Sequence, residues 1–178
     1  MNKKNKLTDS LNKIFLTSGY KMVDVSSKEI TNRKALATGE IILGSQVIKM
    51  IKAKKMPKGD PLSIAEVSGI NGVKKTSELI PLCHPLPLDH ISLHTEINEK
   101  KYSVVVYCLV SANSKTGVEM EALSGVNSAL LAIYDLSKIV EPNLKITNTK
   151  LLVKSGGKKG LWINPDGIPQ NIKSILNL

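Results

Sequence analysis

Four short clusters of polar and charged residues interrupt an otherwise ordinary alternation of helix and strand patterns. Each cluster holds residue types that can exchange protons or contact phosphate. A basic binding surface has little need for a proline-flanked histidine, paired glutamates and a glycine-hinged lysine pair together. We therefore interpret the group as acid–base chemistry on a phosphorylated small molecule. The clusters are Lys58-Gly59-Asp60, Pro81-Leu82-Cys83-His84-Pro85-Leu86, Lys115-Thr116-Gly117-Val118-Glu119-Met120-Glu121 and Lys154-Ser155-Gly156-Gly157-Lys158.

The second cluster places His84 between Cys83 and Pro85. A residue before proline is restricted to extended backbone, so the imidazole is held in a stiff frame at the end of a predicted helix. This suits a positioned acid, base or phosphate contact. A histidine that caps the helix through hydrogen bonds is an equal alternative. Cys83 is predicted to point into the core as a small apolar side chain.

The third cluster opens a long helix pattern. Thr116 and Glu119 have the spacing of a capping box, with Glu119 at the third helical position. Glu119 and Glu121 also both suit the positive end of a helix. Two close carboxylates can equally bind the N–C–N edge of a guanidine-like group, so a structural and a ligand-facing role are balanced here.

Asp135 and Lys138 are three residues apart on the same predicted helix, so their side chains can meet. An exposed ion pair contributes only about 0–1 kcal/mol. The neighbouring apolar residues instead predict that the pair lies at the edge of the core. A lysine held beside an aspartate stays protonated and can serve as a general acid.

The fourth cluster offers free backbone N–H groups and two ammonium groups, an arrangement that suits phosphate. It is not a Walker A loop, because Leu152 and Lys159 stand where that motif needs glycine and a hydroxyl residue. Lys74 and Lys75 add positive charge late in the preceding helix pattern.

The histidines do not have the spacing of a metal site. On a strand His90 and His94 would lie about 13 Å apart, too far to share one ion. We therefore expect no metal and no cofactor.

The composition favours an anionic partner. The net charge is +10, and Arg33 is the only arginine among 25 basic residues. The charge either marks a nucleotide or nucleic-acid partner or reflects a lysine-rich composition. Arg33 either marks a site that needs the planar guanidinium fork or stands there by chance. Aromatic residues make up only 3% of the chain, which leaves few stacking platforms for single-stranded nucleic acid.

The cellular compartment is predicted from features that the sequence lacks. No apolar run reaches the roughly 18 residues of a membrane helix. Cys83 and Cys108 lack CxxC spacing, which is typical of a reducing compartment. We expect a cytoplasmic protein without a membrane partner. Organellar targeting by the N-terminus stays open as an alternative. The segment is basic, but its basic residues are lysines, whereas transit peptides are rich in arginine.

Hydrophobic periodicity and turn residues divide the chain into strands and helices. Asp60 and Pro61 form the clearest boundary, since aspartate is a preferred N-cap and proline suits the first helical position. The string Asn98-Glu99-Lys100-Lys101 separates two β-branched runs, which predicts a hairpin. Strands are predicted over 37–43, 91–97, 102–110 and 146–153, and helices over 45–56, 61–79 and 117–140.

This order predicts an α+β fold of the split-βαβ kind, with an antiparallel sheet covered by helices on one face. We expect a mobile polar extension over residues 1–20, a single catalytic domain over 21–160 and a tail over 161–178.

Taken together, five strings in order resemble cyclic pyranopterin monophosphate synthase, the C protein of molybdenum-cofactor biosynthesis. The resemblance runs from Met22 to about Gly160. It implies a ferredoxin-like fold and a homohexamer built from dimers, with sites at dimer interfaces. The substrate would be the 3′,8-cyclised dihydro-GTP, and the products would be cyclic pyranopterin monophosphate and pyrophosphate. The five strings are the first, third and fourth clusters above, the second cluster preceded by Leu79-Ile80, and Ile133-Tyr134-Asp135 with Lys138.

The same resemblance implies residue roles by motif position. Lys58 and Lys138 would be the principal catalytic lysines, and Asp135 the partner of Lys138. The triphosphate would be held by His84, Lys74, Lys75, Lys154 and Lys158. The purine-derived end would be lined by Glu119, Met120 and Glu121, with Cys83 and Arg33 among the further substrate-binding positions.

Two other functions are set against this one. A nucleic-acid-binding module would use the positive charge, and a non-catalytic escort would bind the unstable intermediate without converting it. The complete set of acid–base groups favours the enzyme.

Overall fold

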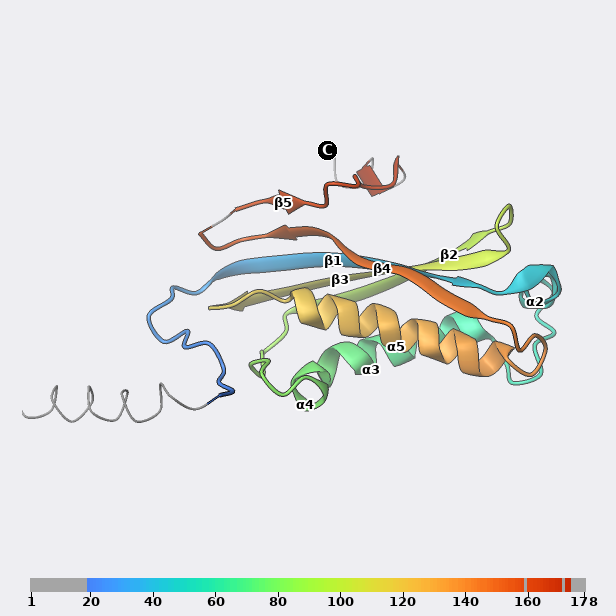
Figure 1. Cartoon of the computed structure of the whole chain (residues 1–178), viewed down its shortest axis with the longest axis horizontal. Coiled ribbons are helices and arrows are strands. Elements are labelled where there is room, and N and C mark those ends of the chain that lie inside the picture. Colours follow the sequence, from blue (N-terminus) through green and yellow to red (C-terminus); the bar gives the residue numbers. More distant parts are fainter. Residues whose placement is uncertain (1–18, 159, 171, 174–178) are drawn as a thin grey trace, which may run out of the picture.

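The computed structural model describes residues 19–158, 160–170 and 172–173 (Figure 1). The extension predicted over residues 1–20 therefore falls almost entirely outside the described residues. Five strands form one antiparallel sheet in the order β2-β3-β1-β4-β5. The strands are β1 (Thr31–Ile42), β2 (His90–Asn98), β3 (Ser103–Ser114), β4 (Lys145–Ser155) and β5 (Trp162–Ile163).

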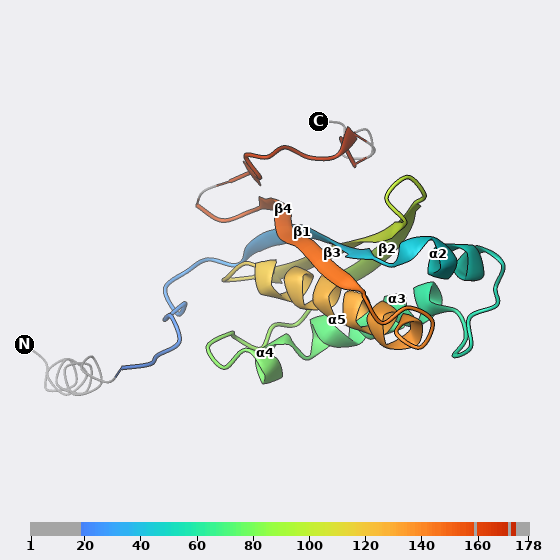
Figure 2. The ribbon, with the colours of Figure 1, turned by 45° about the vertical axis from the view of Figure 1, so that its right-hand side comes forward.

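The helices lie on one face of this sheet, which confirms the predicted α+β, ferredoxin-like arrangement. Figures 1 and 2 show α3 and α5 side by side beneath the strands, with α2 at one end of the sheet. The helices are α2 (Gly44–Lys52), α3 (Pro61–Lys74), α4 (Thr76–Leu79) and α5 (Glu119–Ser137).

Local capping explains one predicted boundary and corrects another. Asp60 accepts hydrogen bonds from the Leu62 backbone and the Ser63 hydroxyl, so the N-cap predicted before Pro61 is confirmed. The helix predicted over 61–79 is instead two helices. The Thr76 hydroxyl donates to backbone carbonyls of the preceding turn at 2.9 and 3.2 Å, and such bonds compete with a continuing helix.

Glycines allow α3 and α5 to approach closely. A Cβ on Gly125 would lie 2.6 Å from both the Cys108 sulfur and a Val73 methyl, so no larger residue fits without movement. Gly69 of α3 faces Gly125, because a Cβ on Gly69 would lie 3.0 Å from the Gly125 carbonyl oxygen. On the sheet, α5 packs against β1 and β3, and α3 packs against β2.

The C-terminal segment covers part of the opposite sheet face (Figure 1). Its described part adds β5 to the sheet edge and places Ile168 and Ile172 against Leu36, Tyr107 and Leu152, in a second apolar cluster. Part of the tail predicted over 161–178 therefore packs onto the sheet, through β5, Ile168 and Ile172.

Candidate functional site

Three of the predicted residues meet at the C-terminal end of α5. The Asp135 carboxylate receives the Lys138 ammonium group at 2.8 Å on one oxygen and the Lys58 ammonium group at 3.0 Å on the other. Lys58 comes from the turn before α3, where Gly59 adopts a positive φ of 92°. We call Lys58, Asp135 and Lys138 the lysine–aspartate cluster.

The cluster lies further out than predicted. The Asp135–Lys138 contact is confirmed, but the two side chains are 51% and 53% exposed, so the pair is not shielded at the core edge. The reason is that Asp135 faces away from the buried stripe that holds Ile133.

The contacts within the cluster lower the pKa of Asp135 and raise the pKa of Lys138. Hydrogen bonds from Lys138 and Lys58 hold the pKa of Asp135 below its usual value. The hydrogen bond and charge of Asp135 raise the pKa of Lys138. Lys138 is therefore kept protonated, as a general acid requires.

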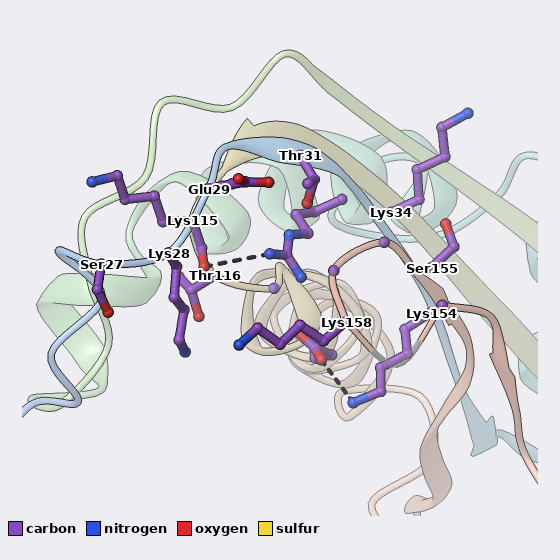
Figure 3. A pocket seen from close by; sticks show the side chains of 16 residues that line it. Ser27, Lys28, Glu29, Thr31, Lys34, Lys115, Thr116, Lys154, Ser155 and Lys158 are labelled. Atoms are coloured by element: carbon purple, nitrogen blue, oxygen red, sulfur yellow. Dashed lines mark hydrogen bonds and ion pairs between the residues drawn. The ribbon is translucent and has the colours of Figure 1, made fainter.

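A basic pocket of about 710 Å³ lies at the other end of α5 (Figure 3). It is walled by the chain before β1, the loop before α5 and the glycine-rich turn after β4. Figure 3 shows the N-terminus of α5 end-on behind the pocket, which adds the positive end of the helix dipole. The cationic lining residues are Lys28, Arg33, Lys34, Lys115, Lys154 and Lys158, against the carboxylates Glu29 and Glu119.

Glu119 does not form the predicted capping box. The N-cap of α5 is Val118, without a side-chain cap, and Glu119 is the first helical residue. Its carboxylate instead receives the Lys154 ammonium group from β4 at 3.0 Å (Figure 3). A contact across the pocket has replaced the local one.

Arg33 uses its planar fork within the protein. Its guanidinium donates to the backbone carbonyls of Ser114 and Lys115 at 3.3 and 3.4 Å. A Cβ on Gly157, which has a φ of 69°, would lie 1.9 Å from the same guanidinium. Arg33 therefore fixes the loop before α5, and the glycine-rich turn packs directly on it.

A smaller pocket of about 250 Å³ lies beside the first turns of α5, and Lys74, Thr76 and Glu121 are among its lining residues. Glu121 is buried, and desolvation, followed by the charge of Glu119, raises its pKa. Burial therefore makes the charged form of this carboxyl less favourable than it is in water.

The loop after α4 holds Cys83 and His84. Cys83 is half-buried, not a core residue, and burial followed by the charge of Glu121 raises its pKa. The backbone N–H of Cys83 donates a hydrogen bond to the Ile80 carbonyl, and this turn keeps the chain at the surface. α4 ends at Leu79, where the helix was predicted to end, and His84 lies in the loop that follows.

The remaining predicted residues are exposed near these pockets. Lys75 lies 3.9 Å from Glu78 in an exposed pair, and the Met120 side chain is partly exposed on the first turn of α5. Lys28 and Lys34 line the basic pocket but were not selected from the sequence, because isolated lysines in a lysine-rich chain carry no spacing signal.

The structure thus divides the predicted site residues into two groups. The lysine–aspartate cluster lies at the end of α5, whereas Glu119, Glu121 and the basic pocket lie at its start. With 19 residues α5 is about 28 Å long. The two groups therefore lie at opposite ends of this helix.

The described residues contain neither a cluster of metal ligands nor a membrane-spanning helix. In these ranges no three or more histidine, cysteine, aspartate or glutamate side chains are grouped so as to hold a metal ion. None of the helices there has the length and apolarity to cross a membrane.

Comparisons with known proteins give a consistent result. The MoaC family model matches residues 22–157. A mitochondrial cyclic pyranopterin monophosphate synthase of Arabidopsis thaliana is 45% identical over 141 residues, which are 79% of this chain and 52% of that protein. The synthase of Aquifex aeolicus is 43% identical over 84% of this chain and 58% of its own length. The chain thus spans little more than half the length of these two relatives. The synthase of Cereibacter sphaeroides (strain ATCC 17029) is 44% identical, over 78% of this chain and 87% of its own length.

Proposed function

Because the chain belongs to the MoaC family, we propose that it converts 3′,8-cyclo-7,8-dihydroguanosine 5′-triphosphate to cyclic pyranopterin monophosphate and pyrophosphate. This would be an early step of molybdenum-cofactor biosynthesis, and its relatives carry the name of this synthase. The observation that carries the proposal is the lysine–aspartate cluster, in which one carboxylate holds two ammonium groups.

The cluster fits the proton transfers of this reaction. Rearranging the cyclised nucleotide into a pterin requires groups that give and take protons at defined positions. Lys138 gives a proton, and Asp135 keeps it charged until then. Lys58 reaches the same carboxylate and is the second donor or acceptor. A positioned group of this kind contributes roughly 10²–10⁴ in rate.

The basic pocket fits the phosphate chemistry. Closing the cyclic phosphate requires a substrate hydroxyl to attack the α-phosphorus while pyrophosphate leaves. Lys154, Lys158 and the N-terminus of α5 supply positive charge where the negative charge of the phosphates would collect. The buried Glu121, whose pKa is raised by desolvation, can face the purine-derived end.

The separation of the two groups supports an oligomer. The cluster and the basic pocket lie at opposite ends of a helix about 28 Å long. A second copy that brings its pocket to the first copy's cluster would complete the site. A symmetric dimer creates two such sites, and we propose that three dimers form a hexamer.

For the compartment we propose the cytoplasm, with targeting by the lysine-rich N-terminus as the alternative. The Arabidopsis relative is named as a mitochondrial protein. Fusing residues 1–18 to a fluorescent reporter distinguishes the two, because a targeting segment would carry the reporter into the organelle.

The reaction is tested by mixing the purified chain with the cyclised GTP intermediate and following pyrophosphate and pterin together. Both products should appear at equal rates. They should fall by roughly 10²–10⁴ in Lys138→Ala and stay unchanged in Lys145→Ala, a control at the exposed start of β4. Binding without products would favour the escort function, and no binding at all would contradict the proposal.

A further inference from the structure

Strand β4 contains a β-bulge just before the pocket lysine Lys154. Along β1, Ala37 pairs with Leu151 and the adjacent Leu36 pairs with Val153. Leu152 is therefore an extra residue without a partner in β1. Such a bulge changes which face of the sheet the following side chains point to.

The bulge turns Lys154 toward the pocket. Leu151 packs in the core on the helix side, whereas Leu152 and Val153 both pack in the second cluster on the far side. The alternation then resumes, and Lys154 returns to the helix side, where it meets Glu119. Without the extra residue Leu152, Lys154 would point to the opposite face of the sheet.

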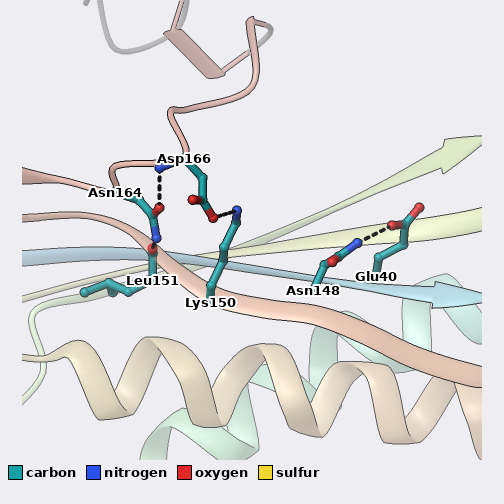
Figure 4. Close-up of polar contacts among 6 residues, drawn as sticks. All are labelled: Glu40, Asn148, Lys150, Leu151, Asn164 and Asp166. Atoms are coloured by element: carbon teal, nitrogen blue, oxygen red, sulfur yellow. Dashed lines mark hydrogen bonds and ion pairs between the residues drawn. The ribbon is translucent and has the colours of Figure 1, made fainter.

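The C-terminal segment holds this bulge in place. The backbone N–H of Asn164 donates to the Leu152 carbonyl at 2.8 Å, and its side-chain amide donates to the Leu151 carbonyl at 2.8 Å (Figure 4). The backbone N–H of Asp166 donates to the Asn164 side-chain oxygen and orients the amide. Strand β5 pairs with Val153 and Lys154 themselves.

Apolar contacts complete the arrangement. The Leu152 side chain is fully buried, and its cluster includes Ile168 and Ile172 from the segment. If the extra residue were exposed, the stabilisation from burying a whole leucine side chain would be lost. The segment supplies the cover that makes the bulge stable.

We propose that Trp162, Ile163, Asn164, Ile168 and Ile172 form a clamp whose role is to position Lys154 in the basic pocket. The clamp lies beyond residues 22–157, which the family model matches. The inference relies on the proposed function only in treating the basic pocket as the phosphate site.

The test measures binding of inorganic tripolyphosphate to the full chain by calorimetry. Asn164→Ala removes one hydrogen bond to the bulge, and the dissociation constant should rise about fivefold. The loss should vanish in the Lys154→Ala background, because the clamp acts through that lysine. Asp166→Asn is the matched control: it removes only the exposed ion pair with Lys150 and should bind like the wild type.

Turnover gives an independent reading. Asn164→Ala should raise KM and leave kcat unchanged, because a cradle that holds ground state and transition state alike affects only binding. A simple loss of folded protein would lower kcat instead. Wild-type affinity in Asn164→Ala, or an equal loss with and without Lys154, would overturn the inference.

The proposed function can fail separately. If the wild-type chain does not bind tripolyphosphate, the phosphate assignment of the pocket is wrong. In that case the crystal structure of Asn164→Ala tests whether the clamp positions Lys154. Loss of the bulge or of the Lys154–Glu119 pair would support it, and an unchanged bulge with the pair intact would refute it.

Discussion

Asp135 favours the protonated form of Lys138, which lies three residues further along the chain. Its carboxylate accepts from two lysines, and it raises the pKa of Lys138. A lysine that acts as a general acid loses activity as the pH rises through its pKa. Asp135 therefore extends the activity of Lys138 toward alkaline pH.

Replacing this carboxylate gives a prediction with a definite sign. In Asp135→Asn the pKa of Lys138 falls, so the alkaline limb of the kcat–pH profile should move to lower pH. The profile is measured with the cyclised GTP substrate across neutral and alkaline pH. Glu141→Gln removes a carboxylate from the loop after α5 and should leave the limb in place. An unmoved limb in Asp135→Asn would mean that another group donates the proton.

Local spacing predicted only part of these contacts. Asp135 and Lys138 were predicted to meet because they are three residues apart on one helix. The contact of Lys58 with Asp135 joins residues 77 positions apart, which no local pattern contains. Glu119 was predicted either to cap its own helix or to face a ligand, but Lys154 from β4 binds its carboxylate instead.

At the scale of elements, the crossing of α3 and α5 depends on glycine. Gly125→Ala would improve the intrinsic helix propensity by about 1 kcal/mol. The added Cβ would also meet Cys108 and Val73 at 2.6 Å, and overpacking of this kind typically costs about 1–3 kcal/mol. We expect the clash to dominate, with a net loss of up to about 2 kcal/mol.

The measurement is urea denaturation at a fixed protein concentration, since an oligomer's stability depends on concentration. The midpoint should fall with an unchanged m-value. A raised midpoint would show that helix propensity outweighs the packing at this crossing.

Element types were predicted well and their ends less well. Asp60 and Pro61 mark the start of α3 because capping is a local interaction. The first part of β1 was missed, since Arg33 and Lys34 break its apolar pattern while pairing with β3. The bulge in β4 was also invisible, because it depends on partners in β1 and in the C-terminal segment.

At the scale of the whole molecule, a site shared between copies can be tested by complementation. Lys138→Ala disables the cluster and Lys154→Glu reverses the charge of the basic pocket, so each variant alone should have little activity. In a dimer containing one of each, one site carries both defects and the other carries none.

Co-refolding equal amounts of the two variants should therefore restore about a quarter of wild-type activity, as random pairing in a two-fold symmetric dimer requires. The activity is measured at low substrate concentration, where binding defects are visible. Refolding each variant separately and then mixing is the control. Absence of recovery after co-refolding would place the complete site within one copy.

The fold class followed from the order of the sequence patterns, but the division of the site did not. The helix predicted over 117–140 already placed Glu119 and Asp135 about 24 Å apart. Which residues gather at each end depends on contacts between distant elements, such as those of Lys58 with Asp135 and of Lys154 with Glu119. The C-terminal segment gave no strand signal either, because β5 has only two residues and is held by its partners.

Trp162 gives this protein a built-in optical reporter. It is the only tryptophan in the sequence, and it pairs with Lys154 at the edge of the basic pocket. Excitation at wavelengths that tyrosine does not absorb will therefore give emission from a single known location. Titrating an anion while recording that emission follows the clamp and the pocket directly, without attaching a dye.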